Sequence, residues 1–336
     1  MSDLPSPRRA LGAASRAAVA LAPLLLSGCA VSYSTLEPVT DFGRAILDVY
    51  GAVLWVTIGI FVVVEALLLF ALWRFRSRPD DPDVPEQVHG HTLVEIGWTL
   101  APALILFLIA IPTVQTVFRT QAEPPGEDPL EIRVVGNQWW WKFEYLDLGF
   151  TTANEMHVPR GRTVRLTLTS DDVIHSFWVP RLGGKRDLNP GSENTLWFTA
   201  DTTGVYEGHC AELCGTSHAN MRLRVFVDEP DVFEAWAEEM ASPAEPDSAG
   251  FQAFLASGCA ACHAIDGTPA QGRMGPNLTR IGDRTTIAAA MLPNTPDEMA
   301  AWLRDPDSLK PGVLMPDLEL SEERIDLLVR MMEDLR

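Results

Sequence analysis

The sequence predicts a multidomain membrane protein that combines a two-helix transmembrane hairpin, an all-β sandwich and a small all-α domain. Three observations support this prediction. Two apolar stretches near the N-terminus are long enough to span a bilayer, a central segment alternates β-branched runs with turn residues, and a Cys-X-X-Cys-His motif lies near the C-terminus. A chain of 336 residues has room for two or three domains of this kind.

The composition narrows the class of partner. The formal net charge of −19 argues against nucleic-acid binding and is compatible with the docking of a basic redox partner. Of the five cysteines, four lie in two metal-type motifs, and only Cys29 stands apart from them.

Residues 1–28 are predicted to be a lipoprotein-type signal peptide, so they are left out of the fold prediction. Basic residues, among them Arg8 and Arg16, precede a small and apolar run at 17–26. The ending Leu-Ser-Gly before Cys29 resembles a bacterial lipobox, in which the cysteine is acylated and becomes the mature N-terminus. The alternative is an ordinary signal sequence with an incidental cysteine.

Residues 29–122 are predicted to form the transmembrane hairpin, with helices at about 51–73 and 97–118. Basic residues from Arg74 to Arg78 follow the first span, which places the connecting loop in the cytoplasm. The N-terminus and everything after the second span then lie outside the cytoplasm.

Residues 123–230 are predicted to form a β-sandwich, because short runs rich in β-branched residues are separated by Gly, Pro, Asn and Asp. The predicted strands include Glu131–Val135, Thr163–Thr169, Thr195–Thr199 and Arg222–Val227. Residues 231–249 predict a short helix and a linker rich in Pro, Ser and acid. They separate a C-terminal domain, 250–336, which ends in an amphipathic helix capped by Ser321.

The loop from Cys210 to Met221 carries a candidate metal site. It brings two cysteines, His218 and a methionine within twelve residues. Soft sulfur with imidazole suits copper in an electron-transfer site, whereas a structural zinc site has no use for the methionine. His175, between two strand-like runs, offers one more ligand. The alternative is a disulfide between Cys210 and Cys214, which is common outside the cytoplasm.

This set resembles the binuclear copper centre (CuA) of subunit II in haem–copper cytochrome c oxidases. The metal ligands that the resemblance implies are His175, Cys210, Glu212, Cys214, His218 and Met221. It implies that both thiolates bridge two copper ions. One ion takes the upstream histidine and the methionine, and the other takes the loop histidine and the backbone carbonyl of Glu212. It also implies a cupredoxin Greek-key fold for the sandwich.

The second motif, Cys259-Ala-Ala-Cys262-His263, is the attachment signature of a c-type haem. A redox Cys-X-X-Cys pair is the alternative, but it would want a βαβ context. Methionine as sixth ligand raises the haem potential. Met315, in a loop bounded by prolines, is the predicted sixth ligand; Met274 competes with it but lies closer to the attachment motif.

The resemblance implies further roles and leaves one departure. Trp139 matches the exposed electron-entry point near CuA, and Glu95 matches the mouth of a proton channel into subunit I. The side chain of Glu212 matches one that reaches a Mg²⁺ or Mn²⁺ ion at the subunit I interface. Ser192 stands where the family usually has arginine, so the resemblance does not extend to an interfacial ion pair at this position. Glu65, inside the first span, has no assigned role.

Taken together, the chain is similar to the fused subunit II of caa3-type cytochrome c oxidases, in which a class I cytochrome c domain follows the CuA domain. The resemblance implies an electron relay from a soluble or membrane-bound cytochrome c, or a cytochrome bc1 complex, through haem c and CuA to subunit I. Oxygen reduction and proton translocation then occur in subunit I, and this chain holds no catalytic residue. Subunits I and III and the lipid bilayer are the implied partners. The implied location is the bacterial inner membrane, with the folded domains in the periplasm.

Three alternatives remain at this stage. A quinol oxidase subunit II keeps the hairpin and the sandwich but lacks the copper ligands present here. The CuA subunit of a nitric oxide reductase uses nearly identical ligands, and Glu95 favours the oxidase over it. A membrane copper carrier or assembly protein has no need of a haem domain.

Overall fold

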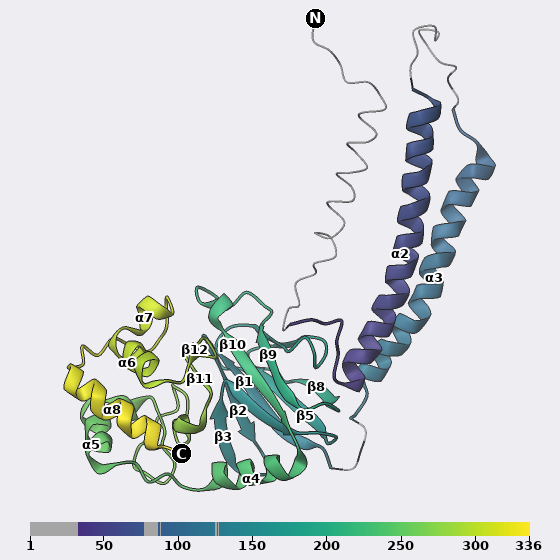
Figure 1. The fold of residues 1–336 in the computed structure, drawn as a ribbon. Coiled ribbons are helices and arrows are strands. Elements are labelled where there is room, and N and C mark those ends of the chain that lie inside the picture. Colours follow the sequence, from purple (N-terminus) through teal and green to yellow (C-terminus); the bar gives the residue numbers. More distant parts are fainter. Residues whose placement is uncertain (1–32, 77–86, 88, 125, 127) are drawn as a thin grey trace, which may run out of the picture.

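The computed structural model describes residues 33–76, 87, 89–124, 126 and 128–336. The predicted signal peptide and Cys29 lie outside the described residues. Figure 1 shows a helical hairpin, a β-sandwich, and a C-terminal helical domain that lies beside the sandwich on the side away from the hairpin. This is the fold class expected from the sequence.

The hairpin consists of α2 (Asp41–Arg74) and α3 (Thr92–Gln121). Their most apolar windows have mean hydropathies of 2.6 and 2.1 and bury none of their residues within the chain. At about 1.5 Å per residue, both helices exceed the roughly 30 Å of a hydrocarbon core. They begin before the predicted spans at 51 and 97, because the extra turns contain polar residues that hydropathy does not mark as membrane-spanning.

The first turn of α2 is fixed to the sandwich. Thr40 caps the helix: its Oγ1 accepts a hydrogen bond from the backbone N of Gly43 at 2.9 Å and donates one to the carbonyl of Leu182 at 2.6 Å. Arg44 forms an ion pair with Asp201 at 2.7 Å. The membrane helix therefore continues directly from the folded domain rather than from a flexible tether.

Two five-stranded sheets form the sandwich, in the orders β3-β2-β1-β5-β8 and β4-β10-β9-β6-β7. The strands are β1 (Leu130–Asn137), β2 (Trp140–Tyr145), β3 (Phe150–Ala153), β4 (Glu155–Pro159), β5 (Thr163–Ser170), β6 (His175–Trp178), β7 (Arg186–Leu188), β8 (Asn194–Thr199), β9 (Gly204–Cys210) and β10 (Arg222–Asp228). Strand β1 pairs in parallel with β5 and antiparallel with β2.

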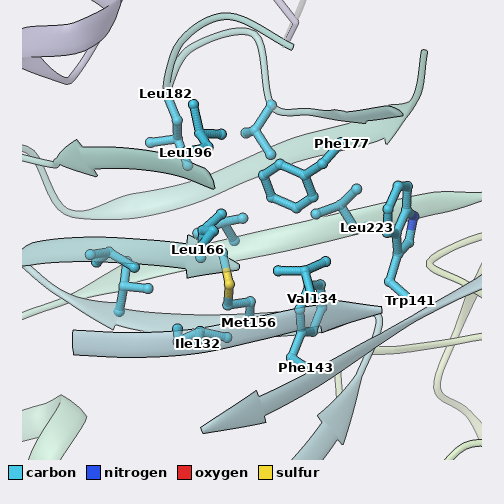
Figure 2. Close-up of a cluster of buried hydrophobic side chains, with 14 of the residues drawn as sticks. Ile132, Val134, Trp141, Phe143, Met156, Leu166, Phe177, Leu182, Leu196 and Leu223 are labelled. Carbon is cyan, nitrogen blue, oxygen red and sulfur yellow. The ribbon is translucent and has the colours of Figure 1, made fainter. Parts of the chain in front are cut away.

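The core of the sandwich follows from strand periodicity. In β5, Val164, Leu166 and Leu168 are fully buried and alternate with partly exposed residues. Figure 2 shows side chains from both sheets meeting, among them Phe177 and Trp141. Trp141 is completely buried, so this member of the three-tryptophan run is a core residue.

The C-terminal domain is a small helical unit joined to the sandwich by α4 (Pro230–Ala241). Its elements are α5 (Ser248–Ala256), η2 (Cys259–Ala261), η3 (Ile281–Asp283), β11 (Thr286–Ile287), β12 (Leu292–Pro293), α6 (Pro296–Arg304), α7 (Pro306–Leu309) and α8 (Glu322–Asp334). Helices α5 and α8 pack closely at Gly250, where a Cβ atom would lie only 2.4 Å from the Cβ of Met331. Ser321 caps α8, as predicted, by accepting a hydrogen bond from the N–H of Arg324.

Candidate metal centre and haem crevice

The pairing of β6 with β9 builds the first half of the metal centre. Phe177 lies opposite Cys210 in this antiparallel pair, which brings His175 at the start of β6 alongside the cysteine at the end of β9. The His175 Nδ1 lies 3.9 Å from the Cys210 Sγ. Both side chains are buried.

The loop between β9 and β10, with its short helix η1 (His218–Asn220), supplies the second half. The Cys214 Sγ lies 3.6 Å from the Nδ1 of His218 and 3.8 Å from the Sδ of Met221. The Cys210 Sγ lies 3.2 Å from the carbonyl oxygen of Glu212. The structure therefore brings together all six residues predicted from the sequence.

The two cysteines are free thiols and not a disulfide. Together with His175 they place three ligand atoms within 4.8 Å of one another, the one such cluster among the described residues. The hydrogen bond from Cys214 lowers the pKa of the Cys210 thiol, and the same bond raises the pKa of Cys214. A buried pair that readily gives up its first proton, beside imidazole and thioether, fits copper.

Asp172 orients the upstream histidine, a role that the sequence prediction missed. Its Oδ1 lies 2.7 Å from the Nε2 of His175, which leaves the Nδ1 facing the thiol. Burial lowers the pKa of this histidine, but hydrogen bonds to Asp172 and to Cys210 outweigh burial and raise it. Histidines that bind metals commonly donate a hydrogen bond from the other ring nitrogen to a carboxylate. An aspartate three residues before the histidine was the sequence feature that could have indicated this role.

We expect Asp172→Asn to weaken copper binding roughly 10- to 100-fold, the effect typical of losing such a supporting carboxylate. Competition with a copper chelator measures it. Asp171→Asn is the matched control, because Asp171 is exposed and its carboxylate interacts only weakly, 3.8 Å from Lys142. Equal affinities of the two variants would contradict the assignment.

Trp139 joins the metal centre to the C-terminal domain. Its indole Nε1 donates a hydrogen bond to the carbonyl of Cys214 at 3.0 Å, and the side-chain amide of Gln138 donates to the same oxygen at 2.7 Å. The prediction that Trp139 is exposed is wrong: it is 6% exposed. The physical reason is that the C-terminal domain covers it, with Gly312 so close that a Cβ there would lie 3.2 Å from the indole ring.

A cavity of about 310 Å³ opens between the two domains. Its lining includes Trp139, Trp140, Cys259, Cys262, His263, Met274 and Met315. Both thiols and the histidine of the attachment motif therefore face the same crevice, and the sandwich contributes two indoles to its wall.

The geometry of His263 fits a haem ligand. Its Nδ1 is 2.8 Å from the carbonyl oxygen of Pro276, which leaves Nε2 for a metal, and burial lowers its pKa so that the ring is neutral. Gly275 packs directly against the imidazole ring of His263, because a Cβ at this position would lie 2.5 Å from its Cε1. Both candidate sixth ligands line the crevice, but Met315 packs against the core of the domain while Met274 is 73% exposed.

The carboxylates of Glu95, Glu212 and Glu65 are not among the contacts described at these two sites, although the backbone carbonyl of Glu212 is part of the metal centre. Glu95 lies in the first turn of α3, where its carboxylate accepts a hydrogen bond from the backbone N of His91 at 3.2 Å. The side chain of Glu212 is exposed, and Glu65 lies in the C-terminal half of α2. The local role that the structure gives Glu95 is to satisfy an unpaired N–H at the start of its helix.

Comparisons with known proteins match each of the three parts of this arrangement. The transmembrane-domain model of cytochrome c oxidase subunit II matches residues 43–116, and the model of its periplasmic domain matches 149–229. A cytochrome c model matches residues 248–335.

Two similar proteins align with nearly the full length of the chain, and a third aligns with about two thirds of it. Cytochrome c oxidase subunit 2 of Alkalihalophilus pseudofirmus is 38% identical over 93% of this chain and 94% of its own length. The protein of the same name from Bacillus subtilis is 36% identical over 95% of this chain and 96% of its own. Quinol oxidase subunit 2 of Bacillus cereus is 31% identical over 65% of this chain and 76% of its own length.

Proposed function

The chain belongs to the cytochrome c oxidase subunit II family, and from that premise we propose that it relays electrons from a c-type cytochrome, through its own haem c and a CuA centre, to the haem–copper subunit I. The observation that carries the proposal is the position of Trp139. This residue donates a hydrogen bond to the backbone of Cys214 and also lines the crevice that holds the haem-attachment motif.

The copper ligands of the proposal are the six residues gathered around the two thiols. Cys210 and Cys214 would hold both ions, and His175 and Met221 would be further ligands of one of them. His218 and the carbonyl oxygen of Glu212, which lies 3.2 Å from the Cys210 Sγ, would be the further ligands of the second ion. When bound, the copper pair and the haem supply one-electron redox chemistry, and the buried scaffold limits reorganisation around them.

The haem ligands of the proposal are His263 and Met315, with Cys259 and Cys262 forming the two thioether bonds. The neutral imidazole with its free Nε2 supports the first assignment. The tight packing of Gly272, where a Cβ would lie 2.4 Å from the carbonyl carbon of Cys262, holds the attachment motif in a fixed loop.

The rest of the relay involves partners outside this chain. We propose that the hairpin packs against subunit I in the bacterial inner membrane and that the folded domains lie in the periplasm. Subunit III and a cytochrome c or bc1 donor are further partners. The exposed carboxylate of Glu212 is free to share a Mg²⁺ or Mn²⁺ ion with subunit I, and Glu95 lies at the start of α3, where a proton entrance would open.

Oxygen uptake by the complex isolated from membranes on this chain tests the proposal. With a reduced c-type cytochrome as donor, we expect fast and cyanide-sensitive uptake. Consumption of nitric oxide without oxygen uptake would transfer both sites to a nitric oxide reductase. A preparation with a labile single copper and neither activity would indicate a copper carrier.

A further inference from the structure

The C-terminal domain is held against the sandwich by two separate contacts. The first, the Glu155 contact, joins the start of β4 to β11. The Glu155 carboxylate accepts a hydrogen bond from the backbone N of Thr285 at 3.0 Å and one from its Oγ1 at 2.7 Å. A third bond comes from the Oγ1 of Thr286. The acceptor and these donors lie about 130 residues apart in the sequence.

The position of Glu155 is unusual for a carboxylate. It is 3% exposed, and a buried charge is costly unless it is hydrogen-bonded. All three of these donors come from the other domain. Burial lowers the pKa of Arg284 in the C-terminal domain to about 10, and the negative charge of Glu155 acts in the opposite direction. Arg224, paired with Glu155 across β4 and β10, donates to the Thr285 hydroxyl at 3.1 Å.

The second contact, the Lys310 contact, lies on Trp139. The Lys310 Nζ donates hydrogen bonds to the carbonyl of Trp139 at 2.6 Å and to that of Ala288 at 3.3 Å, and its side chain is almost completely buried. Burial lowers its pKa to about 7, and either protonation state has enough N–H groups for both carbonyls. The Ser217 hydroxyl donates to the next carbonyl, that of Pro311, at 2.6 Å.

At least one residue from each contact lines the haem crevice. Thr286, beside Thr285, lines it together with Lys310 and the two tryptophans, so the contacts set how the crevice meets the indole of Trp139. We propose that Glu155 is a positioning residue: by holding β11, it keeps the haem crevice closed against Trp139 and so sets the rate of electron transfer between the two centres. This inference rests on the proposed function.

The step that Glu155 controls is a one-electron exchange within the chain. A haem held in the crevice would lose one electron and a copper pair held by the thiols would gain it, so the balance needs no other reagent. An external donor then reduces the haem again. Because the docked domain covers Trp139, an external donor has no direct access to that residue, and its electron enters through the haem.

The test compares Glu155→Gln with the parent complex, purified whole. The new amide would turn an N–H toward the donors of β11 in place of an oxygen, so the ratio of docked to undocked domain is expected to fall about 10- to 100-fold. Rapid reduction of the haem, followed by its reoxidation through copper, gives the transfer rate. Hydrogen exchange at residues 285–287 and 310–313 reports undocking. We expect slower transfer and faster exchange, with both redox potentials and spectra unchanged.

Two further variants make the result decisive. Glu229→Gln is the matched control, since this exposed acid pairs with Arg160 at 2.8 Å on the same sandwich. Replacing Thr285 and Thr286 with valine removes the hydroxyl groups that donate to Glu155. This double substitution should slow electron transfer in the parent, but it should slow transfer little further when Glu155→Gln is already present. If the complex does not assemble with Glu155→Gln, the valine variant alone tests the positioning role.

The outcomes separate this inference from the proposed function. If the parent complex passes no electron from haem to copper, the relay itself is wrong. If the parent transfers rapidly and the Glu155 and valine variants match it in rate and exchange, only the positioning role is overturned. A changed copper or haem spectrum in both variants would also overturn it, because the effect would then be structural.

Discussion

Cys210→Ser is expected to abolish oxygen uptake supported by a reduced cytochrome while leaving the haem spectrum intact. Cys210 is 2% exposed, and the smaller serine fits its place. A serine hydroxyl does not ionise near neutral pH, however, so it does not replace a thiolate whose pKa is already lowered by Cys214. One bridging ligand is lost, and the electron has no centre to reach after the haem.

Paramagnetic resonance measures this outcome directly. The parent should show one unpaired electron shared by two coppers, and the variant should not. Cys262→Ser is the reciprocal control, since the same substitution in the attachment motif should disturb the haem and leave the copper signal unchanged. A normal copper-pair spectrum in Cys210→Ser would refute the ligand assignment.

The parts of the site that the sequence predicted are those whose residues are close in the chain. The copper loop spans twelve residues, and the attachment motif spans five, so the residue types and their spacing point to a metal site and a haem-attachment site before the fold is known. His175 was the exception, and it was proposed because it lies between two strand-like runs in the same segment as the loop. The structure adds the register of β6 on β9 that brings it to Cys210.

The parts that could not be predicted depend on how two domains pack. Trp139 matches a residue that is exposed in the family, yet it is buried here by Lys310 and Gly312, about 171 residues further along the chain. Glu155 looks like an ordinary polar residue at the start of a strand. No local periodicity marks such contacts, because they exist only after both domains have folded and docked.

The predicted start of the first membrane helix differs from the observed one for a related reason. Hydropathy starts the first span near residue 51, whereas α2 begins at Asp41. Its first turn contains Asp41 and is capped by Thr40. Polar residues of these types are as common in loops as at helix starts, so the sequence does not mark the turn as helical. Packing of Phe42 against the sandwich, and not transfer into lipid, stabilises that turn.

Met315→His is expected to lower the haem reduction potential by on the order of 100 mV, within the ~0.8 V range over which axial ligands tune haem iron. Methionine favours the ferrous state, and imidazole, a stronger donor, favours the ferric one. Since about 59 mV changes a one-electron equilibrium tenfold, reduction by the cytochrome donor becomes roughly 50-fold less favourable. Oxygen uptake from that donor should fall accordingly, and a stronger artificial reductant should restore it.

Met274→His is the matched variant, because both methionines line the same crevice but Met274 is largely exposed. It should leave the potential within a few tens of millivolts of the parent. Redox titration of the haem in the purified complex distinguishes the two. A large shift in Met274→His with none in Met315→His would exchange the assignments. In that case the loop that carries Met315, which begins just after Lys310, would not bind the iron. Its role would be limited to docking the domain on Trp139.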